Sequence, residues 1–333
     1  MRTVTFPAVD GQTHWIVATL RFMRAVLVVN PKATATTAAG RDVLAHALAS
    51  QVKLDVLETD YRGHAMAAAA QAMVDGADLV VAHGGDGTVN EVVNGLLASG
   101  PGSSVPMLGI VPGGSANVFA RSLGLPRDPV DATYQLLHAL ENGRRRQVGL
   151  GRVMAASPGE APRWFTFSAG VGWDADVVAE VDRKRGKKAS PALYTRVALT
   201  QYLKPAHGQP QLRVEIPGMA PVEGLRLVFV SNTDPWTYLG ARPIHLNRGT
   251  GFDGGLGVFA LHSLALPTVA RHLRQAISRK GETRGRKLLR HDDVPGLRIT
   301  SDSPVRVQCD GDLIGERTCV EIASVRHALT VVG

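Results

Sequence analysis

The feature that most constrains the fold of this chain is a glycine-rich turn over residues 84–88, with the sequence Gly-Gly-Asp-Gly-Thr. The residues before it, 78–82, form a short apolar run that predicts a buried parallel strand. The residues after it, 88–98, carry apolar side chains at helical spacing. A strand, a glycine turn and a helix in this order predict a parallel α/β sheet, with free backbone N–H groups at the start of the helix.

The same alternation of strand and helix continues through the first part of the chain and then stops. We expect strands at 25–30, 52–57, 78–82 and 107–111, and helices at 38–50, 64–74, 88–98 and 116–123. Beyond about residue 143, β-rich segments separated by turn-forming residues predict an antiparallel sandwich with inserted helices. Its expected strands are 148–154, 164–169, 211–216, 225–232, 257–262 and 305–309, and its expected helices are 175–185, 193–203 and 266–278.

Composition and charge indicate which partners and which location to expect for the protein. The formal net charge of +8 favours anionic partners such as nucleotides, nucleic acids or acidic membranes. The only cysteines are Cys309 and Cys319, so no disulfide framework exists and a cytoplasmic location is expected. No apolar run approaches the roughly 18 residues that a membrane-spanning helix needs. Residues 1–22 lack a secretory signal and are expected to be either a loose extension or an artefact of start-site choice.

The glycine turn has the properties of a phosphate-binding loop. Glycines let phosphate groups approach the backbone without a Cβ in the way. Asp86 lies within the turn and would repel phosphates unless Mg²⁺ bridged the two. Asn90 and Glu91 follow as capping or polar residues. The alternative is an ordinary tight turn between a strand and a helix.

A second glycine segment follows the strand expected at 107–111. Its Ser115 is a candidate phosphate ligand, and Ser115 or Asn117 could instead cap the next helix. On its own, a simple helix cap would be the better interpretation. Two such turns in successive βα units favour one nucleotide cleft at the carboxyl ends of neighbouring strands.

Together these segments resemble the diacylglycerol kinase catalytic family, which includes soluble bacterial lipid kinases and sphingosine kinases. The matching segments are Asn30-Pro31-Lys32, Thr59 with Gly63-His64-Ala65, residues 84–91, residues 112–126 and Gly170 to Ala175. Two positions depart from the family pattern: Ser115 replaces Thr, and Val118 replaces an acidic residue. The first turn is shared with NAD kinases, whereas residues 112–126 point to the lipid kinases.

The resemblance implies an α/β ATP-binding domain at 24–146 and a β-sandwich lipid kinase domain at 147–317. It further implies that residues 318–333 return to the first domain, after an extension at 1–23, and that ATP binds in the cleft between the domains. The ATP-binding residues it indicates are Asn30, Lys32, Thr59, Gly84, Gly85, Asp86, Gly87, Thr88, Val89, Asn90, Glu91, Ser115, Asn117, Arg121 and Asp312. Lys32 and Arg121 would neutralise phosphate charge, although either could be a solvated surface charge.

The resemblance also assigns a metal and a base. In the loop 251–257, Asp253 corresponds to the family's Mg²⁺ ligand, and Thr250 and Gly255 to positions that supply backbone oxygens. Asp310, in Asp310-Gly311-Asp312, corresponds to the proton acceptor, with Asp312 in place of the family's Glu. The spacing alone favours plain Asp-Gly turns at Asp310 and leaves that alternative open at Asp253.

The expected function is that of an ATP- and Mg²⁺-dependent lipid kinase. The basic runs 183–188 and 271–290 suggest contact with an anionic membrane, or else solvated surfaces, and they lack the interleaved aromatics of a nucleic-acid site. Scattered histidines argue against zinc. NAD kinase and a catalytically silent lipid or nucleotide sensor are the alternatives. The acceptor stays open among diacylglycerol, a sphingoid base, phosphatidylglycerol and an isoprenoid-linked lipid, and the oligomeric state, a homodimer included, stays open too.

Overall fold

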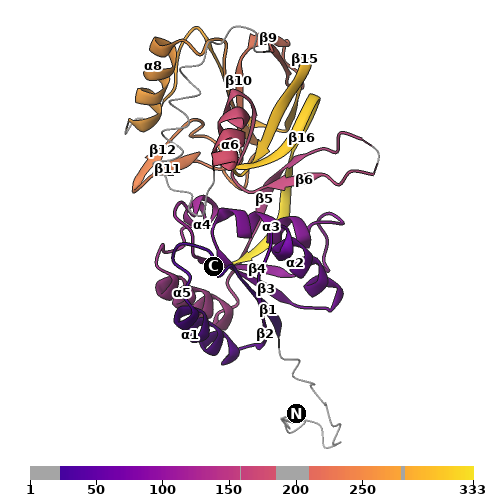
Figure 1. Ribbon diagram of the computed structural model, residues 1–333, viewed down its shortest axis with the longest axis vertical. Coiled ribbons are helices and arrows are strands. Elements are labelled where there is room, and N and C mark those ends of the chain that lie inside the picture. The colour runs from indigo at the N-terminus through magenta and orange to yellow at the C-terminus, as the bar shows by residue number, and fades with distance from the viewer. Residues whose placement is uncertain (1–22, 158, 185–209, 279–281) are drawn as a thin grey trace, which may run out of the picture.

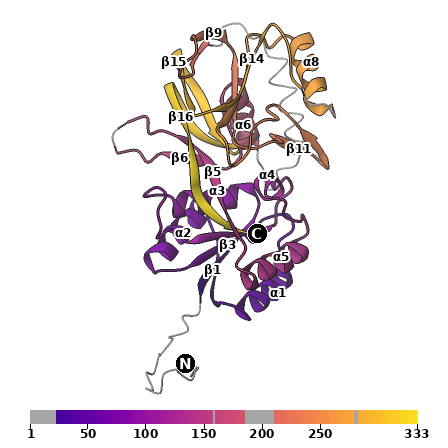
Figure 2. The same cartoon turned by 180° about the vertical axis from the view of Figure 1, so that it is seen from behind.

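The structure is a computed structural model that describes residues 23–157, 159–184, 210–278 and 282–333. Two regions are stacked along the long axis, an α/β region and a β-rich region, and the C-terminus lies in the α/β region (Figures 1 and 2). Within the described ranges, every helix is too short or too polar to cross a bilayer. The expected extension at 1–22, the expected helix at 193–203 and most of the basic run 183–188 lie outside the described residues.

The α/β region is a parallel sheet with helices on both faces (Figure 1). Its strands lie in the order β4-β3-β1-β2. Its elements are β1 (Arg24–Val29), α1 (Ala38–Ala49), β2 (Lys53–Glu58), α2 (His64–Val74), β3 (Leu79–Gly84), α3 (Asp86–Leu96), β4 (Met107–Pro112), α4 (Val118–Ser122) and α5 (Pro129–Glu141). Apolar side chains of α1 and α5 pack on one face and those of α2 and α3 on the other, which explains why β3 is buried along its whole length.

Two details of this region differ from the expectation. Helix α3 begins at Asp86 rather than at Thr88, so Asp86 and Gly87 belong to its first turn. Helix α5 was not expected, although its start has a clear signal: Asp128 accepts hydrogen bonds from the N–H groups of Val130 and Asp131, and Pro129 occupies the first turn.

The β-rich region is mainly antiparallel and encloses its own apolar core. Its first elements are β5 (Arg145–Val153), β6 (Arg163–Phe165), β7 (Ser168–Gly172), α6 (Trp173–Lys184), β8 (Leu212–Glu215) and β9 (Val222–Leu225). The remaining elements are β10 (Leu227–Ser231), β11 (Thr237–Leu239), β12 (Arg242–Ile244), β13 (Leu256–Leu261), α8 (Leu266–Ile277), β14 (Leu288–Val294), β15 (Gly296–Cys309) and β16 (Asp312–Val332). The predicted fold class, a parallel α/β region followed by a β-rich region, is confirmed.

The hairpin of β15 and β16 connects the two regions. Its turn consists of Asp310 and Gly311, and Cys309 pairs with Asp312 across it. Near its other end, β16 pairs in parallel with β4 through Val331 and Leu108, while its antiparallel partner is β5. One hydrogen-bonded sheet therefore runs through both regions, and it places the 310–311 turn beside the start of α3.

Candidate active site

The two glycine turns pack directly against each other. The Gly113 N–H donates to the carbonyl oxygen of Gly84 at 2.7 Å. A Cβ on Gly114 would lie 2.6 Å from the Cα of Gly85, closer than any real side chain comes. These glycines are therefore required for loop-to-loop packing, and phosphate binding alone does not explain them.

Gly87 differs from the other glycines of the turn. It is exposed in the first turn of α3, and a Cβ built on it would meet nothing within 4 Å. Its neighbour Gly85 is the N-cap and supplies no side-chain hydrogen bond to the helix. The open space at Gly87 therefore lies beside helix N–H groups that an anion can use.

The carboxyl ends of β1 and β2 supply a polar rim. The Asn30 side chain donates to Thr88 Oγ1 at 3.1 Å and accepts the Lys32 N–H at 3.0 Å. The Lys32 ammonium donates to the Asp60 carbonyl oxygen at 3.1 Å, and Thr59 is buried next to it. This rim holds Lys32, an exposed cation, next to the first turn of α3.

Three predicted nucleotide ligands point inward instead. Val89 is part of the apolar core, and Glu91 accepts hydrogen bonds from the N–H groups of Gly63 and Ala65 at the start of α2. Asn90 is fully buried and donates to Asp310 Oδ2 at 2.7 Å. These side chains position α2, α3 and the hairpin turn, which matches the capping alternative for Glu91.

The Asp310 carboxylate is buried and accepts five hydrogen bonds. Oδ2 accepts from the Asn90 amide, the Thr166 N–H and the Thr166 hydroxyl, at 2.6–2.7 Å. Oδ1 accepts from the N–H groups of Phe167 and Ser168, both at 3.0 Å. Burial raises the pKa of Asp310, and these donors oppose the rise. A base needs an accessible lone pair, and five donors occupy those of Asp310.

Asp86 is less completely enclosed than Asp310. The residue is partly exposed, its Oδ1 accepts a 3.3 Å hydrogen bond from the Phe119 N–H at the start of α4, and the N–H groups of Asn117 and Val118 also favour its ionised form. Burial by the surrounding protein raises the pKa of Asp86 from 3.8 to about 7, and the nearby charge of Asp310 adds to the rise. Asp86 is thus partly exposed and carries a raised pKa, a combination that is common at functional sites.

Two arginines that the sequence analysis did not predict lie close to Asp312, the residue two positions after Asp310. Arg62 contacts Asp312 Oδ1 at 2.7 Å, and Arg163 approaches Asp312 Oδ2 at 3.8 Å while donating to Asn90 Oδ1 at 2.7 Å. Arg62 lies between Thr59 and Gly63, two residues of the family motif, so its position in the sequence could have indicated a functional role. Arg163 begins β6, and no local pattern indicates its role.

In the second glycine segment, Ser115 is exposed and the Asn117 side chain stabilises the turn. Asn117 has a φ of 48°, and its side chain both accepts from the N–H and donates to the carbonyl oxygen of Gly114. Ser115 Oγ lies 3.3 Å from Thr34 Oγ1. Arg121 stacks on the Tyr238 ring, 3.2 Å from its centroid, and donates to the Gly240 carbonyl oxygen. Of the three predicted ligands, Ser115 is therefore the most exposed.

The predicted metal loop lies close to α4 because Phe252 packs edge-on against Phe119, with ring centroids 5.5 Å apart. Asp253 is exposed and pairs with Arg146 at 2.7 Å. The hydroxyl of Thr250 is buried without a partner, and the Gly255 N–H donates to Asp293 at 2.5 Å. The described residues contain no cluster of three or more metal-binding side chains. One carboxylate beside phosphates still fits the way proteins hold Mg²⁺, so Asp253 remains a usable ligand.

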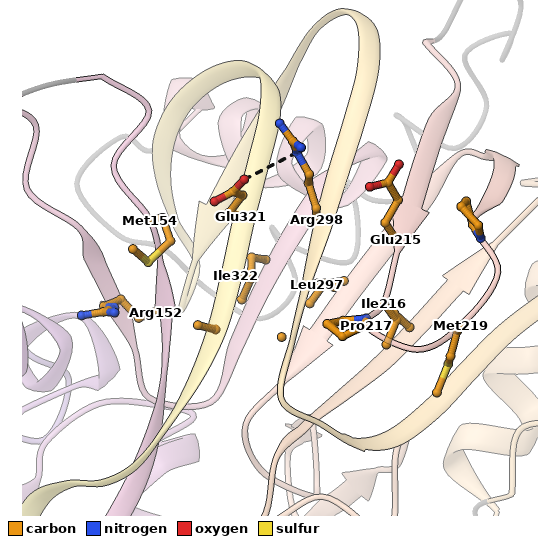
Figure 3. Close-up of a pocket in the computed structure, with 13 residues that line it drawn as sticks. Arg152, Met154, Glu215, Ile216, Pro217, Met219, Leu297, Arg298, Glu321 and Ile322 are labelled. Carbon is orange, nitrogen blue, oxygen red and sulfur yellow. Dashed lines mark ion pairs between the residues drawn. The ribbon is translucent and has the colours of Figure 1, made fainter.

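A separate hollow of about 720 Å³ opens in the β-rich region, between β5, β8, β15 and β16 (Figure 3). Its floor is apolar, with Ile216, Leu297 and Ile322, and Arg298 pairs with Glu321 at its rim at 3.5 Å. None of the predicted nucleotide, base or metal residues lines it.

Residues 24–153 match the family model of the diacylglycerol kinase catalytic domain. A diacylglycerol kinase of Bacillus subtilis (strain 168) is 42% identical over 28% of this chain and 29% of its own length. A YegS-like lipid kinase of Xanthomonas euvesicatoria pv. vesicatoria (strain 85-10) is 36% identical over 39% of this chain and 40% of its own. The chain thus spans less than half the length of these two relatives. A diacylglycerol kinase of Staphylococcus aureus (strain JH9) is 29% identical over 81% of this chain and 79% of its own.

Solved structures extend the likeness to the whole fold. A diacylglycerol kinase from Bacillus anthracis str. Sterne aligns over 94% of this chain and 97% of its own, with 21% identity and a TM-score of 0.68. A second structure from the same organism covers the same shares with a TM-score of 0.72. The resemblance to the diacylglycerol kinase catalytic family, first seen in the motifs, is confirmed.

Proposed function

We propose that this chain, whose residues 24–153 match the diacylglycerol kinase catalytic domain, is an ATP-dependent lipid kinase that phosphorylates a lipid hydroxyl. Relatives named as diacylglycerol and lipid kinases support a kinase with ATP as donor. The observation that carries the proposal is the pair of touching glycine turns, which leaves open space at Gly87 beside the partly exposed Asp86. A bound triphosphate and an attacking hydroxyl both need open space beside polar groups of the protein.

The phosphates would bind at the first turn of α3 and along the polar rim. Backbone N–H groups next to Gly87 and the exposed hydroxyl of Ser115 would donate to phosphate oxygens. Lys32, Arg62 and Arg163 would neutralise charge, which matters more than covalent assistance in phosphoryl transfer. When bound, Mg²⁺ would supply further charge neutralisation, with Asp253 as its protein ligand.

Asp86 is the better candidate for the proton acceptor. A hydroxyl attacking phosphorus loses its proton to a base with a free lone pair and a pKa near the working pH. The pKa of Asp86 is raised to about 7, and the residue is partly exposed, so proton uptake there would disturb fewer short hydrogen bonds than at Asp310. Asp310, the acceptor expected from the family pattern, would first have to lose one of its five hydrogen bonds. We therefore propose that Asp310 positions α3 and the β6–β7 connection and that Asp86 accepts the proton.

The test is phosphate transfer from labelled ATP to dispersed dioctanoylglycerol, to a lipid extract and to NAD, with products separated by thin-layer chromatography. We expect a labelled lipid from wild type, little from Asp86→Asn, and no labelled NADP. Labelled NADP would establish the NAD kinase alternative. ATP binding without a labelled product would establish the sensor alternative, which the absence of acidic residues at Val118 and Gly257 first suggested. In the structure Val118 is buried in the apolar core, so a carboxylate there would have no place.

A further inference from the structure

Helix α8 and the hairpin β11–β12 form one edge of the β-rich region, seen at the left of Figure 1 and at the right of Figure 2. The His245 N–H, next to β12, donates to the carbonyl oxygen of Ala276 in α8 at 2.9 Å, so the two elements are joined. This edge carries exposed apolar and cationic side chains that the kinase chemistry does not use.

The apolar face of α8 is wider than the strip that packs on the sheet. Its inner side buries His272 and Ala276, and the ring of His272 meets Phe259 edge-on at 5.9 Å. Leu266 and Leu273 lie two turns apart on one side of the helix and are 65% and 49% exposed. Together with Leu239 on the hairpin, which is 55% exposed, these leucines expose apolar side chains on both elements of the edge.

Arginines accompany these leucines on the solvent side. Arg271 and Arg274 are exposed on α8, and Arg242 is exposed on the hairpin next to Leu239, which is 55% exposed. Neither residues 238–248 nor residues 264–278 contain an acidic residue. The charged side chains of these two segments are therefore all cationic, although the Arg271 guanidinium also donates to the Arg284 carbonyl oxygen at 3.0 Å, and charge complementarity selects an anionic partner.

We propose that this edge docks on an anionic phospholipid bilayer, with Leu239, Leu266 and Leu273 inserted among the acyl chains. Arg242, Arg271 and Arg274 would lie at the level of the headgroup phosphates. Interfacial helices of this kind bind by combining apolar insertion with cationic contact to anionic lipids. The inference rests on the proposed lipid kinase function, because it names the surface through which that site reaches a membrane-borne substrate.

The hairpin also connects this edge to the candidate active site. Arg121 of α4 stacks on Tyr238 of β11 and donates to Gly240 at the hairpin tip. The N-terminal end of the same short helix donates from the Phe119 N–H to Asp86. A bilayer bound to this edge would therefore lie close to α4. Helix α4 in turn contacts Asp86, the proposed proton acceptor.

The experiment measures sedimentation of the full chain with sucrose-loaded vesicles of phosphatidylcholine, with and without 30 mol% phosphatidylglycerol. Wild type should bind the anionic vesicles, and Leu266→Ser with Leu273→Ser should weaken binding about tenfold or more. Arg271→Ala with Arg274→Ala should weaken it to a similar extent and reduce its sensitivity to salt.

Matched control variants replace exposed apolar and cationic side chains that lie outside this edge. Val74→Ser with Val130→Ser changes apolar residues that are 75% and 69% exposed on α2 and α5. Arg144→Ala with Arg145→Ala removes two exposed arginines at the start of β5. Both controls should bind vesicles like wild type. Equal binding by the leucine variant, or equal losses in the controls, would overturn the assignment of this edge.

Phosphorylation of detergent-dispersed dioctanoylglycerol separates docking from catalysis. If both proposals hold, the α8 variants lose activity on vesicles and keep it on the dispersed lipid. A wild type that phosphorylates the dispersed lipid without binding anionic vesicles would overturn docking alone. Vesicle binding without lipid phosphorylation in either form would overturn the proposed function and leave the docking edge standing.

Discussion

At the scale of single residues, the glycines of the two turns serve different purposes. The motif predicted that they all leave room for phosphate, but contact between the turns accounts for Gly85, Gly113 and Gly114, and the Thr88 side chain fills the space beside Gly84. Gly87 alone among the first turn's glycines faces open space without a positive φ that would demand glycine. The protein's own packing therefore does not require glycine at this position, and the proposed phosphate site would give a reason for it.

Gly87→Ala should separate binding from stability. Alanine in an exposed helical turn should leave stability unchanged or raise it by up to about 1 kcal/mol. The added methyl group would occupy the space beside the helix N–H groups, so ATP affinity should fall about tenfold or more. Isothermal titration and urea unfolding measure the two effects. Gly102→Ala, in another exposed and open position, is the control and should change neither. Unaltered ATP affinity in Gly87→Ala would remove the phosphate site from this turn.

The raised pKa of Asp86 predicts a pH dependence with a definite sign. The folded chain holds this proton up to about pH 7, whereas the unfolded chain releases it near 3.8. The resulting contribution to stability is complete below about pH 4 and is lost as the pH rises to about 7. Activity should rise over the upper part of that range, because the base must be deprotonated.

Carboxyl ¹³C NMR of the chain should show one aspartate titrating near pH 7, and Asp86→Asn should abolish that signal. The same variant should lose about 10²–10⁴-fold in kcat and become less dependent on pH in its stability. Asp75→Asn, an exposed change at the end of α2, is the control. If kcat survived in Asp86→Asn, the proton acceptor would have to be sought elsewhere, with Asp310 first.

At the scale of elements, local signals predicted most of the α/β region and less of the β-rich region. Strand β3 is a continuous apolar run and was found, whereas α5 was missed despite its Asp128-Pro129 start. Only 305–309 of β15 was expected, although the strand spans Gly296–Cys309. Polar residues such as Ser301 to Ser303 interrupt its pattern there, and the pairing with β8 and β16 keeps it extended.

The contact between α2 and α3 predicts an unusual effect of alanine in a helix. A Cβ on Gly95 would overlap the carbonyl oxygen of Met66, a backbone atom that can move only with α2. The clash should outweigh the gain of about 1 kcal/mol in helix propensity. We expect Gly95→Ala to destabilise the chain by about 1–3 kcal/mol, measured by urea unfolding, with Gly102→Ala as the neutral reference. A more stable Gly95→Ala would mean that the helices lie farther apart than described.

At the scale of the whole molecule, the site depends on contacts that no local pattern contains. Asn90 and Asp310 are 220 residues apart in sequence and 2.7 Å apart in space. Their meeting depends on the β15–β16 hairpin, whose far end joins β4 of the α/β sheet. The sequence motifs predicted both residues as functional. They did not predict that the two would bind each other, or that Arg163 would join them.

Because Asp310 is so extensively hydrogen-bonded, we predict that the main effect of Asp310→Asn is a lower free energy of unfolding. The amide would turn an NH₂ group toward N–H donors of the β6–β7 connection, leaving at least one donor unsatisfied in a buried place. We expect a loss of about 3 kcal/mol or more in the free energy of unfolding. Asp86→Asn should cost little or nothing at pH 8, because it removes a carboxylate whose ionised form is poorly solvated. Kinase activity normalised to the folded fraction then distinguishes the two roles. An Asp310→Asn protein as stable as wild type but inactive would make Asp310 the catalytic base and would assign Asp86 to capping α4.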